Sequence, residues 1–333
     1  MATICKHHVL TSMSGIPSRE RDVSQLLLRA GINPLTLEHD SARVHTDQVA
    51  RLFQWVMRTL DDEFMGFAAA PSKLGTFALM SELIPNCLTL REQLRSSTKF
   101  YNLTHTAIQF TLEEHQQSAY LAINLSENTY DAAHFLREFL LVLWHRFPSW
   151  LIGQPINLNA VEFSFDRPEH ESELKIMFPC RIRFGCSENR LIFNASYLDK
   201  PITRTRAELG RYVERTPSDI MTIPGRAQTL ESQIERQLSL RESEQNKVPT
   251  LIEIAQTLQI SPQTLQRRLK QSGSSFNSIK ENWRREHALQ LLRSPQLSVE
   301  HISEKLGFAE ARSFTRAFKT WTGLSPRSYR KIM

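Results

Sequence analysis

Two stretches near the end of this 333-residue chain share one residue pattern, and the equivalent positions Ile254 and Ile302 lie 48 residues apart. In each stretch, two segments with apolar residues at helical spacing flank a short turn. The doubling predicts two helix-turn-helix units in tandem. The first copy contains Ile254-Ala255, Leu258, Ile260-Ser261-Pro262, Leu265, Arg267 and Leu269-Lys270, and the second contains Ile302-Ser303, Leu306-Gly307-Phe308, Phe314, Arg316 and Phe318-Lys319.

Residues suited to helix ends flank these segments. Thr250 and Glu253 have the spacing of a capping box, and Ser261-Pro262 joins a good N-cap to a residue that fits the first helical position. Gly307 is placed to end the first helix of the second copy. Between the copies, residues 277–292 have an apolar pattern of helical period, which predicts one helix that fixes the separation of the two units.

Basic side chains are concentrated in the same part of the chain. Residues 231–333 carry 17 Lys and Arg against 10 Asp and Glu, whereas the residues before them carry 24 against 25. A basic part suits the binding of a polyanion, because neutralised phosphates supply most of the sequence-independent affinity. Together with the two helix-turn-helix units, this predicts double-stranded DNA as a partner; a basic solvated surface is the alternative.

The second helix of each unit is expected to contact DNA. Arg can donate two hydrogen bonds to guanine, and Gln can form two with adenine, in the major groove. For each residue, a phosphate contact or a solvated helix face is the alternative, and Lys319, Arg327 and Arg330 are expected to contact phosphate or to pack. The candidates are Gln263, Gln266, Arg267, Arg268 and Lys270 in the first unit, and Arg312, Ser313, Arg316 and Lys319 in the second.

The length of the chain predicts two domains, each large enough to bury a core. Apolar runs are shorter than the ~20 residues that span a bilayer, and the amino terminus lacks a signal-peptide pattern, so a cytoplasmic location is expected. The chain has four cysteines, Cys5, Cys87, Cys180 and Cys186, without zinc-site spacing. We therefore expect reduced thiols rather than a disulfide framework.

The first 200 residues predict an α+β domain, an antiparallel sheet with helices. Thr46 can cap a helix that has Val49, Phe53 and Val56 on one face, and residues 131–150 predict a longer helix. The C-terminal part is predicted to be all α. Alternation or β-branched and aromatic residues predict strands at 107–112, 119–125, 160–165, 181–184 and 191–194.

Prolines and a drop in apolar density mark the expected boundary between the two domains. We predict an effector-binding or dimerisation domain at residues 1–205, a linker at 206–240 that contains a helical piece, and a double helix-turn-helix domain at 241–333.

The C-terminal part resembles a known family. LSVEHISEKLGFAEARSFTRAFKTWTGLSPRSYR, residues 297–330, is similar to the signature of AraC/XylS transcription regulators, and SPQTLQRRLKQSGSSF, residues 261–276, is similar to their first recognition helix. Ala311 and Arg312 depart from the family pattern, which leaves the second half-site sequence open. Residues 23–209 resemble more loosely the arabinose-binding-type domain of that family, through HDSARVHTDQVARLF, LREFLLVLWHRFPSWL and FPCRIRFGCSENRLIFNASYLDKP.

The resemblance implies a transcription regulator with promoter DNA and RNA polymerase as partners. For the front domain, it implies a small-molecule effector, a second copy of the chain, or both.

Motifs of enzymes are incomplete in this sequence. Phe178-Pro179-Cys180-Arg181 is similar to the Pro-Cys-His-Arg nucleophile of alkyltransferases but lacks the His, and Walker A, Rossmann and G-x-S-x-G motifs are missing. His7-His8 without further ligands is a poor metal site, and His145-Arg146 is a conceivable anion site that is more often structural. We expect no enzyme, cofactor or metal; an enzymatic or alkyl-acceptor front domain is the alternative.

Overall fold

The computed structural model describes residues 3–17, 22–39, 42–126, 130–221, 230–245, 248–271 and 274–332, without the side chains of 232, 236, 241 and 243–245. The chain forms two compact units. The sheet unit contains residues 4–21 and 49–225, and the helical unit contains residues 1–3, 22–48 and 226–333. The helical unit is therefore built from segments on both sides of the sheet unit in the sequence.

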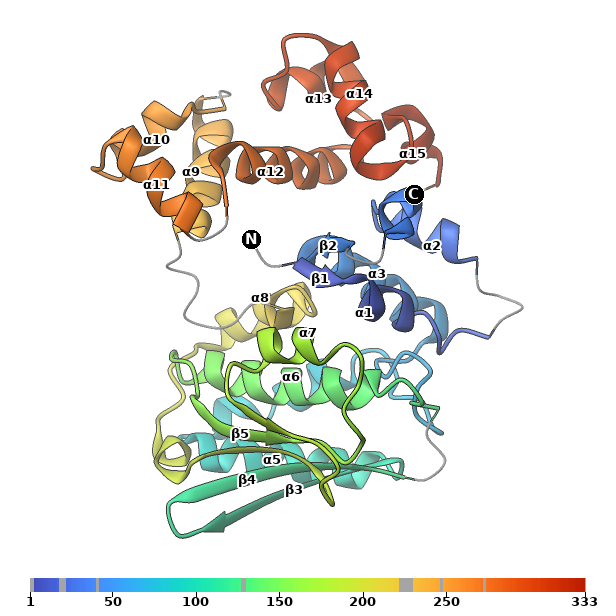
Figure 1. The fold of residues 1–333 in the computed structure, drawn as a ribbon, viewed down its shortest axis with the longest axis vertical. Helices are drawn as coiled ribbons and strands as arrows, with labels where there is room; N and C mark the ends of the chain where they lie inside the picture. The colour runs from blue at the N-terminus through green and yellow to red at the C-terminus, as the bar shows by residue number, and fades with distance from the viewer. Residues whose placement is uncertain are drawn as a thin grey trace. The chain divides into compact units, whose positions relative to one another are not determined.

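The sheet unit is organised around a five-stranded sheet, of which β3, β4 and β5 are labelled in Figure 1. The strand order is β3-β4-β7-β5-β6. Neighbouring strands are antiparallel, except that β5 pairs with β6 in parallel. The parallel pair departs from the predicted antiparallel sheet, because a crossover that includes α7 (Glu171–Met177) joins β5 to β6. The strands are β3 (Ile108–His115), β4 (Ser118–Leu125), β5 (Leu158–Glu162), β6 (Arg181–Arg183) and β7 (Asn189–Asn194).

All five strands that the sequence predicts are present, and the α+β fold class is confirmed. Helices α5 (Leu90–Thr104) and α6 (Phe135–Leu151) pack against the sheet and against each other. Aromatic rings form part of this core, since Phe110 of β3 lies 4.5 Å from Trp144 of α6 between ring centroids. The apolar sheet face is thus covered by the long predicted helix.

Before α9, the elements outside the five-stranded sheet and its two covering helices are short, apart from α3. Helix α3 is the helix predicted to begin at Thr46. These elements are β1 (Thr3–Cys5), α1 (Lys6–Thr11), α2 (Val23–Arg29), β2 (Arg43–His45), α3 (Thr46–Leu60), α4 (Thr76–Ser81) and α8 (Arg206–Arg215), with 3-10 turns at Pro34–Glu38, Ile84–Asn86, Ala195–Asp199 and Asp219–Met221.

The helical unit has one apolar core, to which every helix from α9 to α15 contributes. Its largest fully buried side chains are Phe314, Phe318 and Tyr329. The helix predicted at 277–292 is α12, and it begins at a capping box formed by Ser275 and Ser278. The helices are α9 (Leu230–Gln245), α10 (Leu251–Thr257), α11 (Pro262–Gln271), α12 (Phe276–Leu291), α13 (Val299–Lys305), α14 (Ala311–Thr322) and α15 (Pro326–Ile332).

Helix α9 begins inside the segment that the sequence assigns to a linker. Ile234 and Leu238 are fully buried in the helical core, and the indole of Trp283 donates a hydrogen bond of 2.9 Å to Ser239. Buried Glu242 pairs with His287 at 3.1 Å and with Lys305 at 3.2 Å. These contacts give α9 a structural role in the helical unit.

Helix α2 also belongs to the helical unit. The hydroxyl of Tyr329 in α15 donates a hydrogen bond of 2.8 Å to the carbonyl oxygen of Arg29. Gly323 ends α14 with φ +81°, and a Cβ added there would make tight contacts of 3.2 Å with the side chains of Asn33 and Leu28. Residues 22–33 thus contact the end of the second helix-turn-helix unit.

In the sheet unit, the backbone at Gly15 lies close to the backbone at Met65, and this contact can be tested. A Cβ added to Gly15 would lie 1.9 Å from the carbonyl oxygen of Met65, so Gly15→Ala should force a backbone shift and cost about 1–3 kcal/mol. The matched control is Gly210→Ala, because Gly210 is exposed in α8 with open space around its Cα, and alanine favours a helix. Thermal denaturation should show a lower midpoint for Gly15→Ala alone; equal midpoints would contradict the close approach.

Candidate functional site

The first helix-turn-helix unit consists of α10 and α11. Thr250 and Glu253 form the predicted capping box of α10, and the Ser261 hydroxyl accepts a hydrogen bond from the Thr264 amide at 3.1 Å where α11 begins. Leu265 and Leu269 of α11 are buried in the helical core. All five predicted DNA-contacting residues of α11 are exposed: Gln263, Gln266, Arg267, Arg268 and Lys270.

The second unit, α13 and α14, repeats this arrangement. Gly307 lies in the turn with φ +66°, which favours glycine, and Phe314 and Phe318 of α14 are fully buried. The predicted residues on α14 are again exposed: Arg312, Ser313, Arg316 and Lys319. Each second helix therefore has a buried apolar side and an outward polar side, as a major-groove helix requires.

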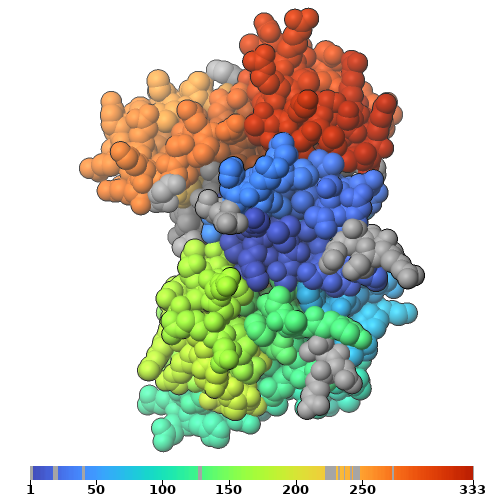
Figure 2. Space-filling model, turned by 45° about the vertical axis from the view of Figure 1, so that its right-hand side comes forward, coloured from blue at the N-terminus to red at the C-terminus, as the bar shows by residue number. Residues whose placement is uncertain are grey.

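The residues predicted to contact DNA on α11 and α14 include arginines and no acidic residues. Their guanidinium groups lie on the surface of the helical unit. In Figure 2, the segment that contains α10 and α11, coloured orange, lies at the surface. Contacts of individual side chains with bases or phosphates stay predictions.

Arg284 of α12 is a residue that the sequence reasoning missed. Its guanidinium donates hydrogen bonds to the carbonyl oxygens of Leu306 at 2.8 Å and Gly307 at 2.6 Å, and it lies 4.4 Å from the centre of the Phe308 ring. These atoms form the turn between α13 and α14. Arg284 thereby attaches the second helix-turn-helix unit to the connecting helix, which no local pattern in the sequence indicates.

Arg330 has a similar packing role, one of the two that the sequence allows for it. Its guanidinium donates hydrogen bonds to the carbonyl oxygens of Leu292 at 3.2 Å and Leu297 at 2.8 Å, which fix the loop after α12. Arg327, by contrast, is exposed on α15.

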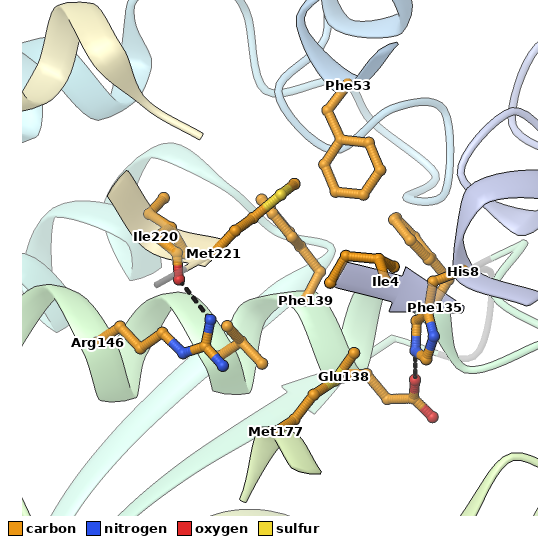
Figure 3. Close-up of a pocket in the computed structure, with 11 residues that line it drawn as sticks. Ile4, His8, Phe53, Phe135, Glu138, Phe139, Arg146, Met177, Ile220 and Met221 are labelled. Atoms are coloured by element: carbon orange, nitrogen blue, oxygen red, sulfur yellow. Dashed lines mark hydrogen bonds and ion pairs between the residues drawn. The ribbon is translucent and has the colours of Figure 1, made fainter. Parts of the chain in front are cut away.

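The sheet unit contains a cavity beside α6 (Figure 3). Its empty space, counted together with its opening to solvent, is about 480 Å³. Three ionisable side chains, His8, Glu138 and Arg146, interrupt an otherwise apolar wall. The apolar lining residues are Ile4, Phe53, Phe135, Phe139, Val142, Met177, Ile220 and Met221.

Arg146 stays charged at this wall, and its Nη1 donates a hydrogen bond of 2.8 Å to the carbonyl oxygen of Ile220. The neighbouring His145 is structural, because its Nε2 is hydrogen-bonded to the Ile156 carbonyl at 2.8 Å and burial lowers its pKa to about 4. Of the pair His145-Arg146, only the arginine therefore borders the cavity.

Glu138 is almost completely buried between two histidines. Its Oε2 lies 2.7 Å from Nε2 of His8, and its Oε1 lies 2.7 Å from Nε2 of His170. Burial disfavours the charged form of His8, but hydrogen bonds with Cys5 and Glu138 outweigh burial and raise the pKa of His8 to about 9. Burial likewise disfavours the carboxylate of Glu138, and the bonds from His170 and His8 lower its pKa below the usual range.

Cys180, the candidate alkyl acceptor, lacks the environment of an activated thiol. Burial raises the pKa of Cys180 to about 11, and its thiol donates to the carbonyl of Arg181 at 3.7 Å. Because the thiolate is the nucleophile, a raised pKa disfavours reaction at neutral pH. The residues that the structure describes thus give the alkyl-acceptor alternative no support.

Comparison with known protein families identifies the family of this chain. Residues 21–202 match the model of the arabinose-binding domain of AraC transcription regulators, and residues 254–332 match a helix-turn-helix domain model. The chain belongs to the AraC family of transcription regulators. Its predicted family membership is confirmed, and like its relatives it is a DNA-binding regulator of transcription.

Individual AraC-family relatives are distant. An uncharacterized HTH-type transcriptional regulator of Mycobacterium tuberculosis is 25% identical over 321 residues, which are 95% of this chain and 91% of that protein. The ornithine utilization regulator of Pseudomonas aeruginosa is 25% identical over 242 residues, 73% of this chain and 70% of that protein. The crystal structure of the regulator CdpR from Pseudomonas aeruginosa, 18% identical, covers 84% of this chain and 90% of that chain with a TM-score of 0.32.

Among the described residues of this AraC-family chain, no helix is both long and apolar enough to cross a membrane.

The Arg284 attachment generates a second test. Arg284→Ala should destabilise the helical unit by about 2 kcal/mol or more, because two carbonyl oxygens lose their charged donor. Arg284→Lys should give an intermediate loss, since one ammonium cannot reproduce the planar fork. Urea denaturation measures both, with Arg293→Ala, at an exposed position after α12, as the control. A loss no greater than that of the control would mean that the attachment contributes nothing.

Proposed function

We propose that this regulator reads promoter DNA with α11 and α14 and is controlled by a small effector that binds in the cavity beside α6. The observation that carries the first part is the exposure of every predicted contact residue on the outward side of two helices whose inward sides form one core. The cavity in the sheet unit carries the second part.

The two helices would enter neighbouring segments of the major groove. Helix α12 connects the units, and its 16 residues give it a length of about 24 Å. Half-sites one helical turn apart are separated by about 34 Å. A single chain would then recognise an asymmetric site with two short determinants, in which Gln263 and Arg267 read one and Arg312 and Arg316 read the other.

The lining of the cavity suggests the class of effector. Most of the wall is apolar, so the body of the effector would be apolar. Binding that prefers one conformer of the regulator would shift its equilibrium toward that conformer and thereby change its activity.

Further assignments follow from family membership. We propose that residues 1–205 act as the effector-binding or dimerisation domain, that residues 241–333 carry the DNA-binding function with 206–240 between them, and that RNA polymerase and a second copy of the chain are partners. The family assignment and the raised pKa of Cys180 both favour a regulator that is not an enzyme.

Base reading and phosphate anchoring can be separated by two substitutions. Arg267→Ala should cost about 1–3 kcal/mol on the cognate site and relax the preference at one base pair, because a bidentate contact to one base is lost. Lys319→Ala should weaken binding to all sequences equally and reduce the salt slope by about one unit. Competition binding against single-base variants at several salt concentrations measures both, with exposed Gln290→Ala as the control.

Equal losses on every base variant for Arg267→Ala would show that Arg267 binds phosphate only. Weakened DNA binding by Gln290→Ala would show that the interface extends to α12.

The effector is testable on the intact protein. A metabolite that binds should stabilise the sheet unit by about 2.7 kcal/mol at a hundredfold excess over its Kd and raise the melting temperature. Val142→Phe, which adds a ring at the cavity wall, should abolish that shift. Leu79→Phe, at an exposed position on α4, should leave the shift unchanged.

A ligand that shifts both variants as much as the original chain would bind outside the cavity. If a broad metabolite screen gave no shift and sedimentation showed a tight dimer, the sheet unit would serve assembly instead.

A further inference from the structure

Three segments of the sheet unit, far apart in sequence, bring metal-ligating side chains together. His8 lies in α1, Glu138 lies in the first turn of α6, and His170 immediately precedes α7. One ring nitrogen of His8, a carboxylate oxygen of Glu138 and one ring nitrogen of His170 all lie within 4.8 Å of one another. Figure 3 shows the pair of His8 and Glu138 at the edge of the cavity.

All three side chains are largely withdrawn from solvent. Their side-chain exposures are 5% for His8, 1% for Glu138 and 10% for His170. Burial of a carboxylate is costly unless it is paired, and one histidine would be enough to pair Glu138. Two imidazoles instead converge on it, one at each oxygen and each at 2.7 Å.

The donor set is one that divalent transition metals prefer. Two imidazole nitrogens and one carboxylate oxygen make up a common zinc site with an open fourth position. Ligand atoms about 2.0–2.2 Å from a tetrahedral ion lie roughly 3.4 Å from one another. This value lies between the 2.7 Å contacts of each histidine with Glu138 and the 4.8 Å limit within which one ligand atom of each residue lies, so small side-chain movements would place three ligand atoms around one ion.

Outer contacts hold both imidazoles with Nε2 toward Glu138. Sγ of Cys5 lies 3.2 Å from Nδ1 of His8, and this hydrogen bond engages the ring nitrogen that would not bind metal. The ring of His7 stacks on that of His170 with centroids 4.0 Å apart and planes 20° apart. A hydrogen bond at the ring nitrogen that does not bind metal is the usual way in which the histidines of metal sites are oriented.

We propose that His8, Glu138 and His170 bind one divalent transition-metal ion of the zinc type. The adjacent pair His7-His8 lacks further ligands in the sequence, and the fold supplies them through Glu138 and His170. His8 and Glu138 also line the cavity, so the proposed site borders the space beside α6. The metal site stands independently of the effector proposed above.

Metal titration of the full chain tests this site. The protein is first freed of metal with a chelator and then titrated with Co²⁺, whose visible absorption reports four-coordinate binding, and Zn²⁺ is used as the competitor. We expect one ion per chain, with the cobalt spectrum abolished by Zn²⁺. His170→Ala should weaken binding about 100-fold or more, beyond the ~10–100-fold loss typical of removing a supporting residue.

A matched control and a second readout protect the test against misfolding. His115→Ala replaces an exposed histidine of β3, with a side-chain exposure of 69%, and should bind metal as the original chain does. Zn²⁺ should raise the melting temperature of the original chain and of His115→Ala but not of His170→Ala. If His170→Ala does not fold, Glu138→Gln, which keeps the shape of the side chain, replaces it and should show the same loss.

Absence of Co²⁺ and Zn²⁺ binding by the folded original chain would overturn the proposal, as would undiminished affinity in folded His170→Ala or Glu138→Gln. The cluster would then be a hydrogen-bonded ion-pair network that closes one end of the cavity.

Discussion

Helix α12 is the element on which both helix-turn-helix units depend. Its apolar side contributes Ile279, Trp283 and Leu289 to the core that all seven helices from α9 to α15 share. Its polar side chains fix the neighbours on either side: Lys280 donates to the Pro249 carbonyl at 3.4 Å, and Arg284 donates to the turn of the second unit. The separation of α11 and α14 is therefore set by one continuous helix rather than by a loop.

Several acidic side chains of the helical unit form caps, ion pairs or hydrogen bonds with other parts of the unit. Glu253 is used in the capping box of α10, buried Glu242 pairs with His287 and Lys305, and Glu281 accepts a hydrogen bond of 3.2 Å from Trp321. These acidic groups are engaged in the fold, whereas the basic groups of α11 and α14 point outward. The basic residues of α11 and α14, which contribute to the excess positive charge counted in the sequence, are therefore exposed on the surface.

The elements that the sequence predicts are those specified by patterns within a few neighbouring residues. Capping at Thr250, the helical period of 277–292 and the glycine turn at Gly307 act within a few residues, and each predicted element is present. The parallel pairing of β5 with β6 was not predicted, because strand partners depend on the path of the whole chain. The attachment by Arg284 escaped prediction for the same reason, since it joins residues 22 and 23 positions apart.

The His8, Glu138 and His170 cluster is a stronger case of the same limit. Its contacts join residues 130 and 32 positions apart, and each member alone resembles an ordinary surface or core residue in the sequence. The exposed sides of α11 and α14 were predictable because a helix repeats its own pattern, whereas the cavity beside α6 is formed by side chains from several segments.

The contact of α2 with α15 has a consequence for chimeric regulators. A fusion that joins residues 226–333 to a foreign sensor domain keeps every helix-turn-helix residue but omits the segment that contacts α14 and α15. The Tyr329 hydroxyl would lose the Arg29 carbonyl, and the surface beside Gly323 that Leu28 and Asn33 cover would be left uncovered. A transplant that carries residues 22–48 as well preserves this interface, so the exchangeable module of this protein is discontinuous in the gene.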